Sequence, residues 1–235
     1  NAGQLLVAVW VTGTPSILVY APALVAASVI TGAFTGAVLE AQTLFQLQTV
    51  RMETMGGAVV AVGMFRELGP VITGLMLAGR VGSAMAAEIG TMKVTEQVDA
   101  LKSMNVDPVD YLVKPRIQAM LISMPILMME AVLVGIASAY IVSVTAFNVD
   151  QAYWMHFMSK FVTMGDIIVA LVKALAFGLI ISTISCREGL NTTNGAVGVG
   201  KSTMQAMVYA SVALLIANFI LTMILNSFFP MGFMR

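Results

Sequence analysis

Between Met55 and Met92 the chain reads MGGAVVAVGMFRELGPVITGLMLAGRVGSAMAAEIGTM. A helix needs about 20 apolar residues to span the hydrocarbon of a bilayer, and this stretch is far longer than that. It also holds charges, beginning with Arg66 and Glu67, and the pair Gly69-Pro70. A helix tends to bend at proline because proline cannot donate the helical hydrogen bond. We therefore expect one long or broken membrane span here.

The remainder of the chain supplies further stretches of the same kind. Of its 235 residues, 59% are hydrophobic and 10% are charged, whereas about 25% are charged in a soluble domain. So few charges cannot cover a water-facing surface of this size, so lipid must solvate much of it. The additional expected spans are Ile17–Leu39, Ile117–Phe147, Ile167–Ser185 and Met204–Phe229. The sequence predicts an all-α integral membrane protein with about five transmembrane helices, in a single domain of residues 1–235.

Two shorter segments suit the membrane surface. Residues 5–16 are apolar but are interrupted by glycine and proline, which favours an N-terminal segment lying at the interface. Residues 148–165 mix Tyr153 and Trp154 with His156 and Lys160. That mixture is typical of an amphipathic segment whose aromatic rings lie at headgroup level.

The loop lysines and arginines predict the orientation. Most of them follow the second and the fourth expected span, at Lys93, Lys102, Lys114, Arg116, Arg187 and Lys201. With five spans both loops lie on one side, and basic loops are cytoplasmic. The N-terminus is therefore expected inside the cell and the C-terminus outside.

The loop after the second span contains a short helical pattern. Thr95 can cap a helix, and Glu96 is favourable in the first turn. Val98 and Leu101 lie on one apolar stripe, whereas Asp99 and Lys102 face elsewhere. A short cytoplasmic helix of this kind could act as a lever for a partner protein, or could rest on lipid headgroups.

The run RELGPVITGLMLAGRVGSAMAAEIGTMKVTEQVDAL, Arg66 to Leu101, closely resembles the signature of the MlaE/YrbE permease family. DPVDYLVKPR, Asp107 to Arg116, continues the resemblance, and a weaker match runs through the GAVGVGKST segment toward the C-terminus. Members of this family are permease subunits of ABC transporters that move phospholipids between inner and outer membranes and so maintain lipid asymmetry. The resemblance implies that the short helix is a coupling helix, with Thr95, Glu96, Val98, Asp99, Leu101 and Lys102 facing the ATPase.

The resemblance also implies an assembly. Its expected members are a second copy of the permease, two cytoplasmic ABC ATPases that hold ATP and Mg²⁺, an MCE-domain protein outside the membrane and often a STAS-domain protein inside. The permease itself is then not an enzyme and needs no cofactor. A bacterial inner membrane is the expected location, with the plastid inner envelope as the alternative.

Charges within the apolar spans are the candidate substrate site. A charge at the bilayer centre costs about 2.5–3.5 kcal/mol on insertion scales, so such groups face a partner or a watery cavity. Adjacent helical residues point about 100° apart, so Arg66 and Glu67 each need a separate partner. Lys173 and Glu130 are the candidates. A buried polar network is one interpretation, and the lipid cavity implied by the resemblance is the other, with Leu39, Leu47 and Leu68 as acyl-chain contacts.

Four further features of the sequence do not indicate a functional site. GAVGVGKS, Gly195 to Ser202, fits the P-loop consensus but follows a membrane helix rather than a β-strand, so we interpret it as a cytoplasmic glycine-rich loop. The single histidine, His156, has no metal-ligand partner at useful spacing. Twelve basic and twelve acidic residues cancel, which leaves no field to attract nucleic acid. Arg80 and Glu88, separated by small residues, favour tight helix packing over substrate binding.

A rival hypothesis needs no ATPase. Glu67, Glu130 and Lys173 could form the proton relay of an ion-gradient-driven secondary transporter. Such transporters are commonly built from inverted repeats, and no such repeat is visible in this sequence. A membrane scaffold without a transport path is a third interpretation, and it leaves the intramembrane charges without a purpose.

Overall fold

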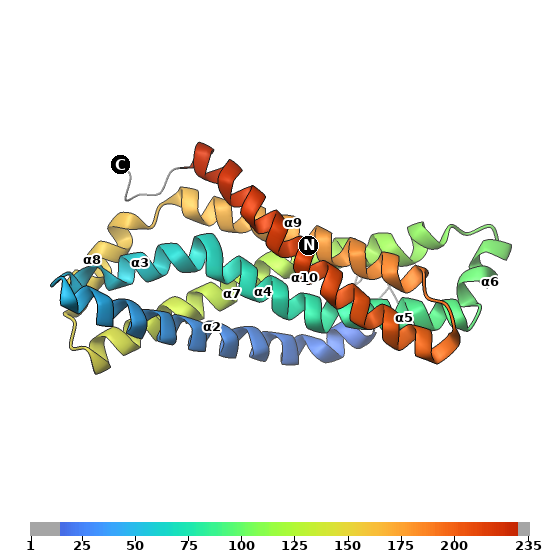
Figure 1. Ribbon diagram of the computed structural model, residues 1–235, viewed down its shortest axis with the longest axis horizontal. Coiled ribbons are helices and arrows are strands. Elements are labelled where there is room, and N and C mark those ends of the chain that lie inside the picture. Colours follow the sequence, from blue (N-terminus) through green and yellow to red (C-terminus); the bar gives the residue numbers. More distant parts are fainter. Residues whose placement is uncertain (1–14, 230–235) are drawn as a thin grey trace. The chain divides into compact units, whose positions relative to one another are not determined.

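The computed structural model describes residues 15–229, and the secondary structure within that range is helical, without strands (Figure 1). Five helical stretches there are long and apolar enough to cross a membrane. They are Ala23–Thr49, Glu53–Val94, Val109–Ala146, Met164–Leu190 and Gly195–Phe228. The all-α class with about five transmembrane helices is thus confirmed, while most of the expected interfacial segment at residues 5–16 lies outside the described residues.

The helices follow the expected order but are longer than the apolar cores that predicted them. They are α2 (Pro15–Thr49), α3 (Gly56–Gly63), α4 (Gly69–Leu77), α5 (Ser83–Val94), α6 (Gln97–Ser103), α7 (Lys114–Ala146), α8 (Gln151–Phe161), α9 (Met164–Leu190) and α10 (Gly195–Phe228). The π-helical turns Met64–Leu68 and Ala78–Gly82 join α3 to α4 and α4 to α5. Of the two alternatives for the second span, the long one is therefore correct.

Contacts divide the chain into two compact units. Unit 1 contains Gly74–Pro125 and Ala174–Ala217. Unit 2 contains Ala23–Thr73, Ile126–Lys173 and the described part of the C-terminal segment, 218–229. The intramembrane charges that the sequence singled out as a candidate site all belong to unit 2.

In unit 1, buried apolar residues of α5, of the π-helical turn Val109–Val113 that precedes α7, and of α9 pack together. Ile89, Val113 and Cys186 form a buried apolar cluster there. Beside it the Arg116 guanidinium, 4% exposed, donates to Glu88 Oε2 at 3.1 Å. Glu88 therefore takes part in packing, as expected.

In unit 2, α2 and α7 approach each other closely through small residues. A Cβ added at Gly32 would meet the Ala131 backbone, and one added at Gly36 would meet the Gly135 backbone. Small residues allow such close approach because no side chain separates the two backbones. The Ser138 hydroxyl reinforces the crossing by donating to the Ala33 carbonyl at 2.7 Å.

The position of Glu130 corrects one expectation. Its Oε2 accepts a hydrogen bond from the Ser28 hydroxyl at 3.1 Å, across the same pair of helices, α2 and α7. It is not hydrogen-bonded or ion-paired to Arg66, Glu67 or Lys173, contrary to the prediction. The sequence could not reveal this because the helical rotation that aims a side chain depends on packing between distant segments.

α8 lies beside α3 in unit 2 and begins at a capped N-terminus (Figure 1). Asp150 Oδ1 accepts from the backbone N–H of Ala152 at 2.8 Å, which satisfies a donor that a helix leaves unpaired. Trp154 is 1% exposed and its indole N–H donates to Glu40 Oε1 at 3.1 Å. The segment expected at 148–165 is thus largely helical, and of its two neighbouring aromatic residues Trp154 is buried within the protein whereas Tyr153 is exposed.

Two local predictions are wrong. The Thr95 hydroxyl donates back to the Thr91 carbonyl at 2.8 Å instead of capping the next helix. α6 begins at Gln97, after Glu96 in a left-handed conformation with φ +62° and without a side-chain cap. The P-loop-like residues 195–202 form the first turns of α10 rather than a loop, so most of their backbone N–H groups are used within the helix.

Candidate functional site

The site is built around a backbone carbonyl, that of Arg66, which lacks its usual helical hydrogen-bond donor. In an α-helix the Arg66 carbonyl would accept from the N–H four residues later, but that residue is Pro70, which has none. The turn Met64–Leu68 is π-helical, a geometry that is frequent at functional sites. Lys173 Nζ donates to the Arg66 carbonyl at 2.6 Å. A lysine from α9 thus satisfies an acceptor that the proline left open.

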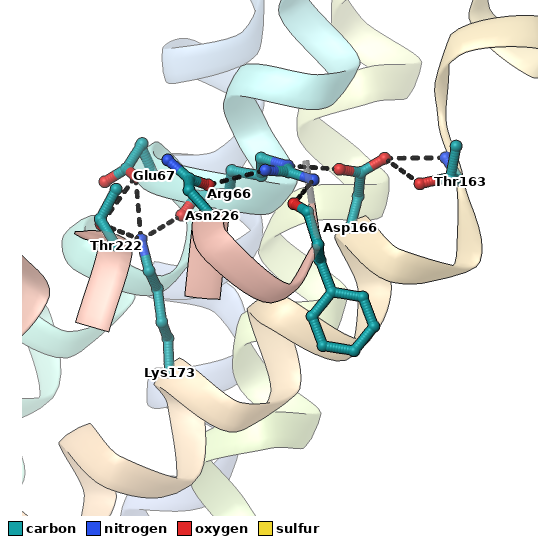
Figure 2. A network of polar contacts seen from close by, with 8 residues as sticks. Arg66, Glu67, Thr163, Asp166, Lys173, Thr222 and Asn226 are labelled. Atoms are coloured by element: carbon teal, nitrogen blue, oxygen red, sulfur yellow. Dashed lines mark hydrogen bonds and ion pairs between the residues drawn. The ribbon is translucent and has the colours of Figure 1, made fainter. Parts of the chain in front are cut away.

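The Arg66 side chain is enclosed by acceptors from α9 and the end of α10 (Figure 2). Its Nε donates to Asp166 Oδ1, and the two side chains are 2% and 0% exposed. Nη1 donates to Asn226 Oδ1 at 2.7 Å and Nη2 to the Phe229 carbonyl at 2.8 Å. A buried charge is tolerable when it is paired and hydrogen-bonded, and Arg66 is both.

Lys173 and Glu67 form the second half of the same network. Lys173 Nζ, on a fully buried side chain, donates to Glu67 Oε1 at 2.9 Å and to Thr222 Oγ1 at 2.7 Å. The Thr222 hydroxyl donates in turn to Glu67 Oε1 at 2.9 Å. Asn218 Nδ2 donates to the other carboxylate oxygen, Oε2, at 2.9 Å. Adjacent residues Arg66 and Glu67 therefore have separate partners, as the helical geometry required.

The network also contains residues that sequence reasoning missed. Asn218, Thr222 and Asn226 repeat at every fourth position of α10, so they form one polar stripe within its otherwise apolar stretch 212–226. Asp166 belongs to the sequence Thr163-Met-Gly-Asp166, which has the spacing of a capping box. Its Oδ2 accepts from the Thr163 backbone N–H at 2.8 Å and from the Thr163 hydroxyl at 2.9 Å. Both signals were present in the sequence.

The charged side chains of the network differ in how far they are exposed. The Glu67 side chain is 39% exposed, whereas that of its partner Lys173 is completely buried. The expected acyl-chain contacts Leu39, Leu47 and Leu68 are each half-buried. Of these, Leu68 lies on the same π-helical turn as Glu67. On α10, Phe219 and Met223 are exposed and follow Asn218 and Thr222 directly in the chain.

The expected coupling residues lie around α6 in unit 1. Val98 is 2% exposed and Leu101 is half-buried, so these two anchor the helix rather than project from it. Asp99 accepts from Lys93 Nζ at 3.1 Å, and this hydrogen bond holds the pKa of Asp99 below its usual range. Beyond the end of α6, Met104 and Val106 are exposed apolar side chains. The large exposed apolar side chains of this region therefore lie just beyond the C-terminal end of α6.

Comparison with known proteins extends these observations. A family profile described as Permease MlaE matches residues 16–224. A probable ABC transporter permease protein of Rickettsia typhi is 43% identical over 192 residues, which cover 82% of this chain and 74% of that protein. One of Synechocystis sp. is 41% identical over 201 residues, covering 86% of this chain and 76% of that protein. The chloroplastic protein TRIGALACTOSYLDIACYLGLYCEROL 1 of Arabidopsis thaliana is 39% identical over 203 residues, covering 86% of this chain and 57% of that protein.

These matches agree with the membrane-compatible helices and with the signature that begins at Arg66. The likeness extends through all five of the apolar stretches described above. A permease forms the membrane path of its transporter and is a transport component rather than a catalytic subunit. The chain is therefore a multi-pass membrane protein that belongs to the MlaE permease family of ABC transporters.

Proposed function

We propose that this permease moves phospholipids between the inner and outer membranes of a bacterial envelope and so helps to maintain lipid asymmetry. One observation carries the proposal. The Glu67 carboxylate is partly exposed at the edge of a buried charge network, and it accepts hydrogen bonds from Asn218 and Thr222 of α10. Each of these two residues is followed in the chain by an exposed apolar residue, Phe219 and Met223. An amphiphile needs this combination, because its headgroup requires polar partners while its tails require apolar ones.

The proposed assembly follows the family. A second copy of this chain would complete the substrate path, and cytoplasmic ABC ATPases would supply the energy from ATP and Mg²⁺. An MCE-domain protein would carry lipid on the outer side, with a STAS-domain protein on the inner side. The name of the Arabidopsis relative, TRIGALACTOSYLDIACYLGLYCEROL 1, refers to a glycerolipid and supports a lipid as substrate.

The arrangement favours this proposal over a proton relay. The relay hypothesis needs Glu67, Glu130 and Lys173 to act in sequence. Within the described residues Glu67 and Lys173 are paired at 2.9 Å, but Glu130 is hydrogen-bonded to Ser28 on α2. A relay would therefore lack its third member.

Glu67→Leu is expected to lower phospholipid transport by at least about tenfold, since it removes the one charged side chain of the network that a headgroup can reach. The measurement is transfer of labelled phospholipid by the assembled transporter in proteoliposomes. Glu53→Gln, which changes a carboxylate outside the network, is the matched control and should transport normally. Unchanged transport by a correctly assembled Glu67→Leu protein would remove the network from the substrate path.

ATPase docking at α6 gives a second test. Introducing charges with Met104→Glu and Val106→Glu is expected to reduce co-purification of the ATPase about tenfold or more, because apolar anchors dominate such interfaces. Gln97→Glu adds one charge at the other end of the helix and should leave co-purification close to normal. If the double variant retains its ATPase, the docking surface lies elsewhere on the chain.

A further inference from the structure

The charged groups of the network differ in what they leave open to a ligand. Lys173 Nζ is fully enclosed, and its three N–H donors are directed at the three acceptors described above. The guanidinium of Arg66 is only 2% exposed, and each of its nitrogens donates to an acceptor within unit 2. Neither cation therefore presents a donor at the surface of the network.

Glu67 is the charged group that a ligand can reach. Its Oε1 accepts from both Lys173 and Thr222, but its Oε2 accepts, within residues 15–229, from Asn218 alone. A carboxylate has about four lone-pair sites, so Oε2 retains capacity for another donor. The neighbouring Asn218 Oδ1 also has no hydrogen-bond partner among the described residues, but it is buried. The accessible group of the network is thus the Glu67 carboxylate, which is an acceptor.

The arrangement of charge points the same way. Arg66 and Lys173 balance Glu67 and Asp166, but both cations lie inside and one carboxylate lies at the edge. An approaching phosphate would meet the Glu67 carboxylate before either cation, whereas an approaching ammonium would be attracted to it. Water is scarce within a bilayer, which strengthens both effects.

We infer that the network selects phospholipids whose headgroup ends in a primary ammonium, with that ammonium donating to Glu67 Oε2. The inference rests on the proposed lipid transport and adds a headgroup class to it. A primary ammonium combines positive charge with N–H donors. Phosphatidylcholine keeps the charge without those donors, and phosphatidylglycerol offers O–H donors without the charge. Comparison with these two lipids therefore separates the contribution of the positive charge from that of the hydrogen-bond donors.

The test is competition among lipids for the assembled permease with its native partners. The complex in detergent is incubated with equal amounts of phosphatidylethanolamine, phosphatidylcholine and phosphatidylglycerol of identical acyl chains, and bound lipid is quantified by mass spectrometry. Phosphatidylethanolamine is expected to be enriched about tenfold over phosphatidylglycerol, which corresponds to one charge-assisted hydrogen bond. Phosphatidylcholine should lie between them.

Two variants of Glu67 test whether this carboxylate causes the headgroup preference. Glu67→Gln removes the charge at nearly constant shape and should reduce the preference to within about twofold, while lipid still binds. Glu67→Asp keeps the charge and should retain the preference, which guards against a general folding defect. Thermal unfolding of each complex verifies its integrity.

The possible lipid-binding results distinguish failure of the ammonium inference from failure of the proposed lipid transport. Equal binding of all three lipids by the unmodified complex, or a preference for phosphatidylglycerol, overturns the ammonium inference but leaves lipid transport standing. A preference that survives Glu67→Gln also overturns it, because the selecting group must then be another. Absence of bound lipid of any kind overturns the inference together with the proposed function.

Discussion

Asp166→Ala is expected to destabilise the protein by about 3–5 kcal/mol, the cost of leaving one partner of a buried ion pair uncompensated. Asp166 is completely buried, and its partner Arg66 is 2% exposed. The same change removes the acceptor for the Thr163 N–H at the start of α9, and loss of such a cap costs about 0.5–2 kcal/mol. Unfolding of the purified protein in detergent, followed by heat or denaturant, measures the loss.

Two further variants separate the ion pair from the cap. Asp150→Ala removes the cap of α8 but no ion pair, since in the part of the chain that the structure describes Asp150 accepts only from backbone N–H groups. It should cost no more than about 2 kcal/mol. Combining Arg66→Met with Asp166→Ala removes both charges and should recover stability relative to Asp166→Ala alone. An Asp166→Ala protein as stable as Asp150→Ala would show that the pair contributes little.

Gly36→Ala is expected to destabilise unit 2 by about 1–3 kcal/mol or more, a cost typical of overpacking. The added Cβ would collide with the backbone of Gly135, which cannot rotate out of the way as a side chain can. Separating α2 from α7 would also strain the nearby hydrogen bonds of Ser28 and Ser138. The measurement is again unfolding in detergent.

Gly63→Ala is the matched control within the same unit. Gly63 is also helical, but a Cβ there would meet nothing within 4 Å. Because alanine favours a helix over glycine by about 0.5–1 kcal/mol, this variant should be slightly stabilised. Equal behaviour of the two variants would contradict the close approach of α2 and α7.

Much of the fold could be predicted from composition and apolar length. The five spans were found near their observed positions because every backbone group in the hydrocarbon must be satisfied within a helix. Helix ends were less predictable. The P-loop-like residues 195–202 were expected to form a loop, yet they extend α10, since nothing in the consensus forces a loop without a sheet to hold it.

The candidate site was predictable only in part. Arg66, Glu67 and Lys173 were recognised because charges in an apolar run are costly, and the three do share one network. Asp166 and the polar stripe on α10 were overlooked although their spacing was visible. Glu130 was placed in the network and belongs elsewhere. The sequence shows that a charged residue within a membrane span needs a partner, but it does not show which residue that partner is.

The sequence by itself determined that this chain crosses a bilayer, where its helices lie, and which side chains need a partner there. Each of these follows from local periodicity and from the cost of exposing polar groups to lipid. Only the tertiary structure decided that Arg66 pairs with Asp166, that Lys173 satisfies the carbonyl freed by Pro70, and that Glu67 is left partly exposed. Those outcomes depend on how helices distant in sequence rotate and pack against one another, which no local pattern specifies.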